Sequence, residues 1–175
     1  MDRKCLVLVL QRNLFQSFVK NNPNYKNKAI WMLTIGVLGF LDATYLAVEH
    51  FLNSIPPCSL VSGCEEVLTS NFAVIGGVPV ALLGALYYLL IVVMTIVFLD
   101  TKNTRVLKIA AKLTILGFIA SLGFVYIQLF VLHAICLYCM GSALTSTLLF
   151  ILGVLVLRTV ENTDAHNTHT GIVNR

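Results

Sequence analysis

The sequence predicts an all-α integral membrane protein, a bundle of four transmembrane helices with an outer loop that carries a short helix. Of its 175 residues, 58% are hydrophobic and only 11% are charged, whereas soluble domains average about a quarter charged residues. The Lys and Arg residues flank apolar segments instead of forming one basic stripe. This charge pattern favours contact with membrane lipid and argues against nucleic-acid binding.

Four apolar segments each come close to the roughly 20 residues that a helix needs to cross the hydrocarbon core. We expect these spans at about 31–52, 78–99, 112–133 and 135–157. Pro79 suits the first turn of the second span, and a polar loop over 100–108 joins the second span to the third. The chain therefore divides into an N-terminal segment (1–30), a membrane domain (31–157) and a polar tail (158–175) that we expect to be disordered.

The basic residues predict the orientation. Six of the twelve Lys and Arg residues precede the first span, four lie within 100–112 and two lie in the tail. With four spans these three regions share one side, while the 53–77 loop and the turn near His133 carry none. Because positive charge is retained on the cytoplasmic side, both termini are expected in the cytoplasm.

The cysteines predict the chemistry. Cys136 and Cys139 are separated by two residues at the point where the third span gives way to the fourth. If a helix begins here, the two thiols share one face and lie close enough to form a disulfide. The unpaired N–H groups and dipole of the first turn would stabilise a thiolate at Cys136. A vicinal thiol pair at a membrane surface suggests redox function.

A second pair, Cys58 and Cys64, lies in the outer loop, while Cys5 falls on the cytoplasmic side and is expected to be an uninvolved thiol. Ser62 and Glu65 fit a capping box, which predicts a short helix with Cys64 in its first turn. A small disulfide loop on a mobile segment can carry electrons between a soluble partner and the membrane-edge pair.

Three other interpretations remain open. The loop pair could be a structural staple with the inner cysteines as small core residues, or all four thiols could bind zinc, although the five-residue spacing and an oxidising compartment disfavour a metal. The chain could also be a small membrane binding or scaffold protein with structural cysteines. Asp42, near the middle of the first span, is a further functional candidate, since an ionisable group there is costly unless it is paired or faces a cavity. Its alternative role is a hydrogen bond to a neighbouring helix.

Together these residues resemble the vitamin K epoxide reductase family, specifically its bacterial members, over about residues 31–157. The matching pieces are the stretch from Leu41 to His50 with Asp42, the pair Cys58 and Cys64 with Ser70 six residues on, the stretch from Gly77 to Tyr88, and the pair Cys136 and Cys139. The resemblance implies a four-helix bundle around a quinone (ubiquinone or menaquinone), covered by the outer loop and its short helix.

The resemblance also implies an activity: a quinone-dependent thiol oxidase, or thiol:quinone oxidoreductase, in the bacterial inner membrane. A periplasmic thioredoxin-fold, DsbA-like protein would hand two electrons to the loop pair, with Cys58 as its contact. Cys64 would relay them to Cys136, and Cys139 would pass them to the quinone. Ser70 corresponds to a serine near the quinone head in this family, and Asp42 to its first-span motif.

Two features depart from parts of the family. Many bacterial members carry a fused thioredoxin-like domain after an extra span, whereas this chain ends after four spans, so its partner is expected to be a separate protein. Vertebrate members have a tyrosine four residues beyond the second cysteine of the inner pair, where this chain has Ala143, which favours a respiratory quinone over vitamin K epoxide. DsbB-like enzymes also have four spans and two pairs, but in the reverse order.

Overall fold

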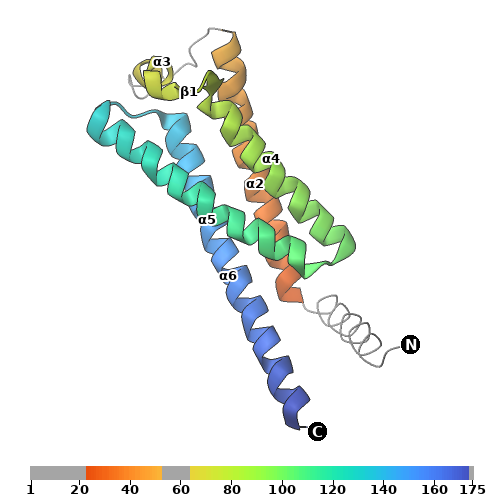
Figure 1. Ribbon diagram of the computed structural model, residues 1–175. Helices are drawn as coiled ribbons and strands as arrows, with labels where there is room; N and C mark the ends of the chain where they lie inside the picture. Colours follow the sequence, from red (N-terminus) through yellow and green to blue (C-terminus); the bar gives the residue numbers. More distant parts are fainter. Residues whose placement is uncertain (1–22, 53–63, 174–175) are drawn as a thin grey trace.

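The computed structural model describes residues 23–52 and 64–173. Figure 1 shows four long helices, α2 (Pro23–Phe51), α4 (Val80–Thr101), α5 (Thr104–Tyr126) and α6 (Leu137–Val173). A π-helical turn, η2 (Ile127–Val131), continues α5. Each of these four helical segments is long and apolar enough to cross a membrane. The prediction of an all-α membrane bundle is therefore confirmed.

Short elements cover one end of the bundle (Figure 1). The predicted loop helix is present as α3 (Cys64–Thr69), with Cys64 as its first residue. A 3-10 turn, η1 (Asn71–Ala73), and a two-residue hairpin of β1 (Val74–Ile75) and β2 (Val78–Pro79) lead into α4. Gly76 and Gly77 form the hairpin turn with positive φ angles of 59° and 83°, a conformation that glycine adopts without a Cβ clash.

The predicted polar loop over 100–108 and the start of the third span at 112 are wrong. α4 ends at Thr101 and α5 begins at Thr104, so only Lys102 and Asn103 separate them. Lys102 adopts the left-handed conformation (φ 54°) and donates its N–H to Phe98 O at 2.8 Å, while the Asn103 side chain accepts from Arg105 N at 3.1 Å. Two of the basic residues that suggested a loop, Arg105 and Lys108, belong to the first turns of α5. A helix can accommodate them there because their long side chains can extend toward the membrane surface.

The tail also differs from its expected disorder, because α6 continues as helix to Val173. Extending an existing helix adds one hydrogen bond for each residue that is fixed, without a new nucleation cost. Proline, which would stop that extension, is absent from 158–173.

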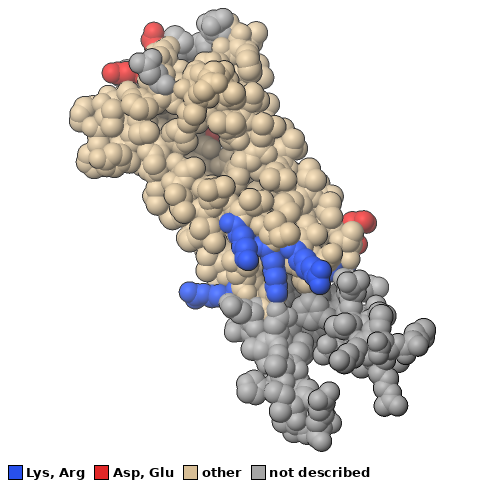
Figure 2. Space-filling view, viewed as in Figure 1, with Lys and Arg blue, Asp and Glu red and all other residues tan. Residues whose placement is uncertain are grey.

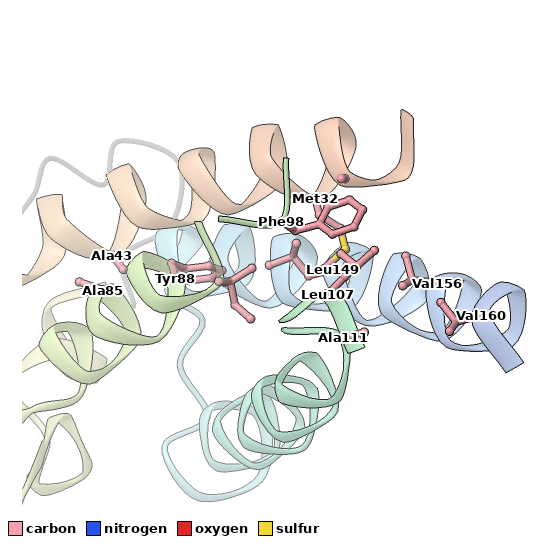
Figure 3. Close-up of a cluster of buried hydrophobic side chains, with 12 residues drawn as sticks. Met32, Ala43, Ala85, Tyr88, Phe98, Leu107, Ala111, Leu149, Val156 and Val160 are labelled. Carbon is pink, nitrogen blue, oxygen red and sulfur yellow. The ribbon is translucent and has the colours of Figure 1, made fainter. Parts of the chain in front are cut away.

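All four helices contribute to one apolar core. α2 packs against α4 and α6, and α5 packs against α6 and α4. Figure 3 shows Met32, Phe98, Leu107 and Leu149, one from each helix, meeting in this core. Lys28 joins α2 to α6 at one end, where its Nζ donates to Thr159 Oγ1 at 2.6 Å and to Leu155 O at 3.3 Å.

Positive charge is segregated along the bundle. Figure 2 shows the Lys and Arg side chains of the described residues gathered toward one end, whereas acidic side chains are visible at both ends. The basic end contains the start of α2 and the α4–α5 turn, and the opposite end contains α3 (Figure 1). Of the redox cysteines predicted from the sequence, Cys64, Cys136 and Cys139 therefore lie at the end away from the basic residues.

Tyr88 fixes α4 against both α2 and α6, and we predict that Gly39→Ala disrupts this contact. A Cβ at Gly39 would overlap the Tyr88 ring, which is 2% exposed. The Tyr88 hydroxyl donates to Ser142 O at 2.8 Å. Overpacking of this kind costs about 1–3 kcal/mol, so thermal unfolding in detergent should occur at a lower temperature. Gly123→Ala, where a Cβ meets open space, is the matched control and should not lower it; equal stability of the two variants would contradict the packing argument.

Candidate functional site

The chain reverses direction between α5 and α6, and the reversal places the inner cysteine pair. In the π turn, Leu132 N donates to Ile127 O at 2.9 Å. His133 then adopts a left-handed conformation with φ 50°, and Ala134 N donates back to Gln128 O at 3.1 Å. The segment is thereby folded against the end of α5 immediately before Cys136.

Cys136 caps α6. Its carbonyl accepts the first helical hydrogen bond from Met140 N at 3.0 Å, although Cys136 itself precedes the helix. The Cys136 sulfur lies 3.5 Å from Cys139 N and accepts that N–H. This is the arrangement in which an N-cap side chain satisfies the third N–H of a helix. The sequence placed Cys136 inside the fourth span, whereas the structure places it one residue before α6, where an anionic sulfur is better stabilised.

The surroundings of Cys136 lower the pKa of its thiol. The largest cause is the hydrogen bond from the Cys139 thiol to the Cys136 sulfur, and the N–H groups of Cys139 and Tyr138 act in the same direction. Burial and the nearby charge of Asp42 oppose them by raising the pKa. The balance favours a thiolate at Cys136, as expected for a cysteine at a helix N-terminus.

The helix of the outer loop covers this pair. Cys64 and Val67 of α3 are buried in one apolar cluster with Ala134 and Cys136, against which Cys139 is packed. Cys64 is 1% exposed and Cys136 is fully buried. The structure therefore brings the loop cysteine and the first cysteine of the inner pair together, at the end of the bundle occupied by α3.

The cysteines differ in redox state. Cys64 is disulfide-bonded, whereas Cys136 and Cys139 are free thiols. The partner of Cys64 therefore lies outside the described residues. Cys58, predicted to pair with Cys64, also lies outside the described residues, as does Cys5.

Asp42 lies on the part of α2 that faces the inner pair. Tyr45, one turn further along α2, contacts the ring of Tyr138 at a centroid distance of 5.4 Å, and Tyr138 stands between the two cysteines in sequence. One carboxylate oxygen of Asp42 is buried and has no hydrogen-bond partner among the described residues. The alternative prediction, a hydrogen bond between Asp42 and a neighbouring helix, is not formed at this oxygen among the described residues.

Ser70 ends α3. Its hydroxyl donates to Val67 O at 2.8 Å, and its carbonyl accepts from Ala73 N at 3.0 Å. These bonds give Ser70 a structural role in closing the helix that carries Cys64. Its position near a quinone head stays a prediction.

The interior of the bundle contains polar groups that suit a quinone. Buried hydroxyls of Thr44, Tyr87 and Ser146 make no hydrogen bond of ordinary geometry among the described residues, although the Tyr87 and Ser146 hydroxyls lie close enough to interact with each other. Such groups are costly when buried without a partner, and hydroxyl donors among apolar walls match the carbonyl oxygens and flat ring of a quinone. Figure 2 shows a hollow on this face of the bundle with an acidic side chain visible inside it.

Gln128 is a site residue that the sequence analysis missed. It is 4% exposed, and its side-chain oxygen accepts from Cys136 N at 3.2 Å. The sequence contains a signal that could have identified Gln128, because it is the only amide or charged side chain between Lys112 and His133. Polar residues within spans are functional candidates by default.

These features define a multi-pass membrane protein with a thiolate-stabilising cysteine pair at one end of a helical bundle. The model of the Vitamin K epoxide reductase family matches residues 30–154, which include the greater part of all four spans, the outer loop and the four cysteines predicted to be functional. The chain belongs to this family. It is therefore a membrane oxidoreductase of a class that links thiol–disulfide chemistry to quinones. No curated protein matches the chain.

The lowered pKa of Cys136 predicts how the inner pair titrates. With the loop disulfide intact and Cys5→Ser, the first thiolate should appear, by its ultraviolet absorbance, below the value of about 8.5 for a free cysteine. Because the Cys139 thiol is the largest cause of the shift, Cys139→Ala should move this step to higher pH. Cys139→Ser keeps an O–H donor and should move it less. A first step at or above the free-cysteine value in the parent protein would contradict the assignment.

Proposed function

We propose that this protein is a quinone-dependent thiol oxidase that reoxidises a separate periplasmic, thioredoxin-fold disulfide-forming protein of the DsbA type. The observation that carries the proposal is the burial of Cys64, in its disulfide-bonded state, in the same cluster as the Cys136 thiol. A structural staple would not need a second thiol pair at this position. A disulfide packed against a stabilised thiol is instead the arrangement needed for exchange.

The electron path begins at the loop. We assign Cys58 as the partner of Cys64 and as the sulfur attacked by a thiolate of the soluble protein, because Cys64 is buried and Cys58 is the other outer-loop cysteine. The second thiol of the soluble protein then attacks its own mixed disulfide. The soluble protein leaves as a disulfide, and Cys58 and Cys64 are left as thiols.

The next exchange passes the electrons to the inner pair. The Cys64 thiolate attacks the sulfur of Cys136 in an inner disulfide, and Cys139 leaves as a thiolate. Cys58 then attacks Cys64, which restores the loop disulfide and releases Cys136. The stabilised thiolate of Cys136 suits this step, because a thiol of low pKa is the better leaving group. The result is an oxidised loop and a reduced inner pair, ready to pass its electrons on.

A quinone bound here would supply the final acceptor of two electrons and two protons. Cys139 would be the residue that faces it, since Cys139 lies within α6 whereas Cys136 precedes that helix. Thr44, Tyr87 and Ser146 would hold the quinone head through their hydroxyls. Asp42 would face the same space, and Ser70 would close the α3 side. A respiratory quinone, ubiquinone or menaquinone, is the proposed species.

The proposed orientation places the α3 end in the periplasm of a bacterial inner membrane, with both termini in the cytoplasm. The segregation of Lys and Arg toward the other end supports this orientation (Figure 2), because positively charged flanks are retained in the cytoplasm.

The test uses the full chain in detergent with a reduced thioredoxin-fold oxidase and either quinone, and it follows quinone absorbance. We expect turnover in the parent protein and in Cys5→Ser. Turnover should be lost in each of the Cys58→Ser, Cys64→Ser, Cys136→Ser and Cys139→Ser variants. The absence of turnover in the parent protein with any quinone or oxidase would favour a membrane binding or scaffold protein with structural cysteines.

A further inference from the structure

Gln128 makes two hydrogen bonds to the short segment that leads into α6. Its backbone carbonyl accepts from Ala134 N at 3.1 Å, and its side-chain oxygen accepts from Cys136 N at 3.2 Å. The residue is 4% exposed and lies within the π turn that ends the third span. One buried side chain thus reaches across the reversal of the chain to the backbone of the first inner cysteine.

The bond to Cys136 N satisfies a donor that has no helical partner. Cys136 occupies the cap position, where the backbone N–H cannot bond within α6. The residue is fully buried, and an unsatisfied buried N–H is strongly disfavoured. Gln128 therefore holds the Cys136 backbone in the conformation that directs its sulfur at Cys139 N.

The π turn is what makes this contact possible. Its wider ring bonds Leu132 N to Ile127 O and carries one more residue per turn than an α-helix, and such turns are frequent at functional sites. Gln128 is the buried residue of this turn, while its neighbour Leu129 is 42% exposed. The geometry of the turn therefore directs Gln128, and not an adjacent residue, toward the cysteine segment.

We propose that Gln128 is a positioning residue that stabilises the reduced form of the Cys136 and Cys139 pair by holding Cys136 at the cap of α6. In the oxidised pair the S–S bond itself holds the two residues together. In the reduced pair the sulfur keeps its place beside Cys139 N only if the backbone is fixed. Loss of the Gln128 contact should therefore destabilise the dithiol more than the disulfide. The consequence for turnover rests on the proposed function, but the redox equilibrium does not.

The quantity to be measured is the equilibrium constant between the Cys136–Cys139 disulfide and glutathione. Two molecules of reduced glutathione give two electrons and two protons to the Cys136–Cys139 disulfide, and the products are the dithiol and oxidised glutathione. The experiment uses the full chain with Cys5→Ser in detergent. Alkylation followed by mass spectrometry of the peptide containing both cysteines reports the fraction that is reduced. Neither quinone nor a protein partner is present.

The test variant is Gln128→Met, which keeps an unbranched side chain of similar length and removes the amide. We expect its equilibrium constant to shift about tenfold toward the disulfide, the size of effect expected from one lost hydrogen bond. Leu129→Met, in the same turn, is the matched control and should stay within about twofold of the parent. Gln128→Asn keeps the amide on a side chain one methylene shorter and should fall between the parent and Gln128→Met.

Thermal unfolding and the quinone assay separate an effect on the redox equilibrium from a loss of folding or of function. Thermal unfolding with the inner pair oxidised identifies a variant that fails to fold, and in that case Gln128→Asn provides the test. An unchanged equilibrium constant in folded Gln128→Met or Gln128→Asn would overturn the inference, whatever the quinone assay shows. A shifted constant in a protein that reduces no quinone would uphold the role of Gln128 while the proposed function fails.

Discussion

Cys139→Ser is expected to abolish quinone reduction and to leave the electron path halted between the loop and the inner pair. Without its sulfur, Cys136 cannot form the inner disulfide, so two electrons cannot be delivered as a pair. The loss should be at least about a thousandfold, since cysteines that act as one unit are not replaced by a hydroxyl. The stability of the fold should change little, because Cys139 and serine differ by one atom at a half-buried site.

The same variant provides a way to trap the exchange. In the Cys5→Ser, Cys58→Ser, Cys139→Ser protein the only remaining thiols are Cys64 and Cys136, which are buried in one cluster. Mild oxidation should join them, and peptide mapping without reductant would detect the link. In the control protein, with Cys136→Ser in place of Cys139→Ser, Cys64 should be linked to Cys139 far less. Equal yields of the two links would contradict the assigned order of the relay.

Val67→Asp is the second change with a large expected effect, because it places a carboxylate in the contact between α3 and the inner pair. Val67 is 8% exposed and belongs to the cluster that contains Cys64 and Cys136. Burying an unpaired charge costs several kcal/mol, more than a contact by a six-residue helix can offset. We therefore expect α3 to leave the bundle and the exchange between Cys64 and Cys136 to slow at least about a hundredfold.

The measurement should separate the two halves of the reaction. Oxidation of the thioredoxin-fold partner coupled to quinone should be lost in Val67→Asp, whereas a small dithiol should now reduce the uncovered inner pair directly and support quinone reduction. Thr69→Asp adds the same charge on the exposed side of α3 and should behave as the parent protein. If Val67→Asp retained coupled turnover, α3 would not be the element that delivers electrons to Cys136.

The sequence predicted the elements whose signal is local. Four spans, the loop helix that begins at Cys64 and the inner pair at the start of the last span all follow from apolar length, capping residues and cysteine spacing. The predicted length of the α4–α5 connection was wrong. Basic residues near Lys102 indicated a polar loop, although such side chains can extend from a helix to the membrane surface. Helix termination by αL and Asn caps at Lys102 and Asn103 depends on backbone conformation, which composition does not reveal.

In the candidate site, too, the sequence did not reveal contacts that depend on backbone conformation or on residues far apart in the chain. Spacing placed Cys136 and Cys139 on one helical turn, but only the fold showed that Cys136 precedes the helix and caps it. The contact of Cys64 with Cys136 joins residues far apart in the chain and depends on how the outer loop folds back. Gln128 could have been suspected as a lone amide in an apolar span, but its partner, the Cys136 N–H, is set by the π turn.

The π turn at Ile127–Val131 makes this part of the chain sensitive to length as well as to side chains. A π turn is equivalent to a single residue inserted into an α-helix, and one residue corresponds to about 100° of rotation around the helix axis. A single-residue deletion here would return the segment to regular α-helix and rotate the residue that then follows Ile127 by about that angle, away from the Cys136 N–H that Gln128 now holds. Substitutions in the turn can be absorbed locally, whereas a deletion removes the register on which this contact depends.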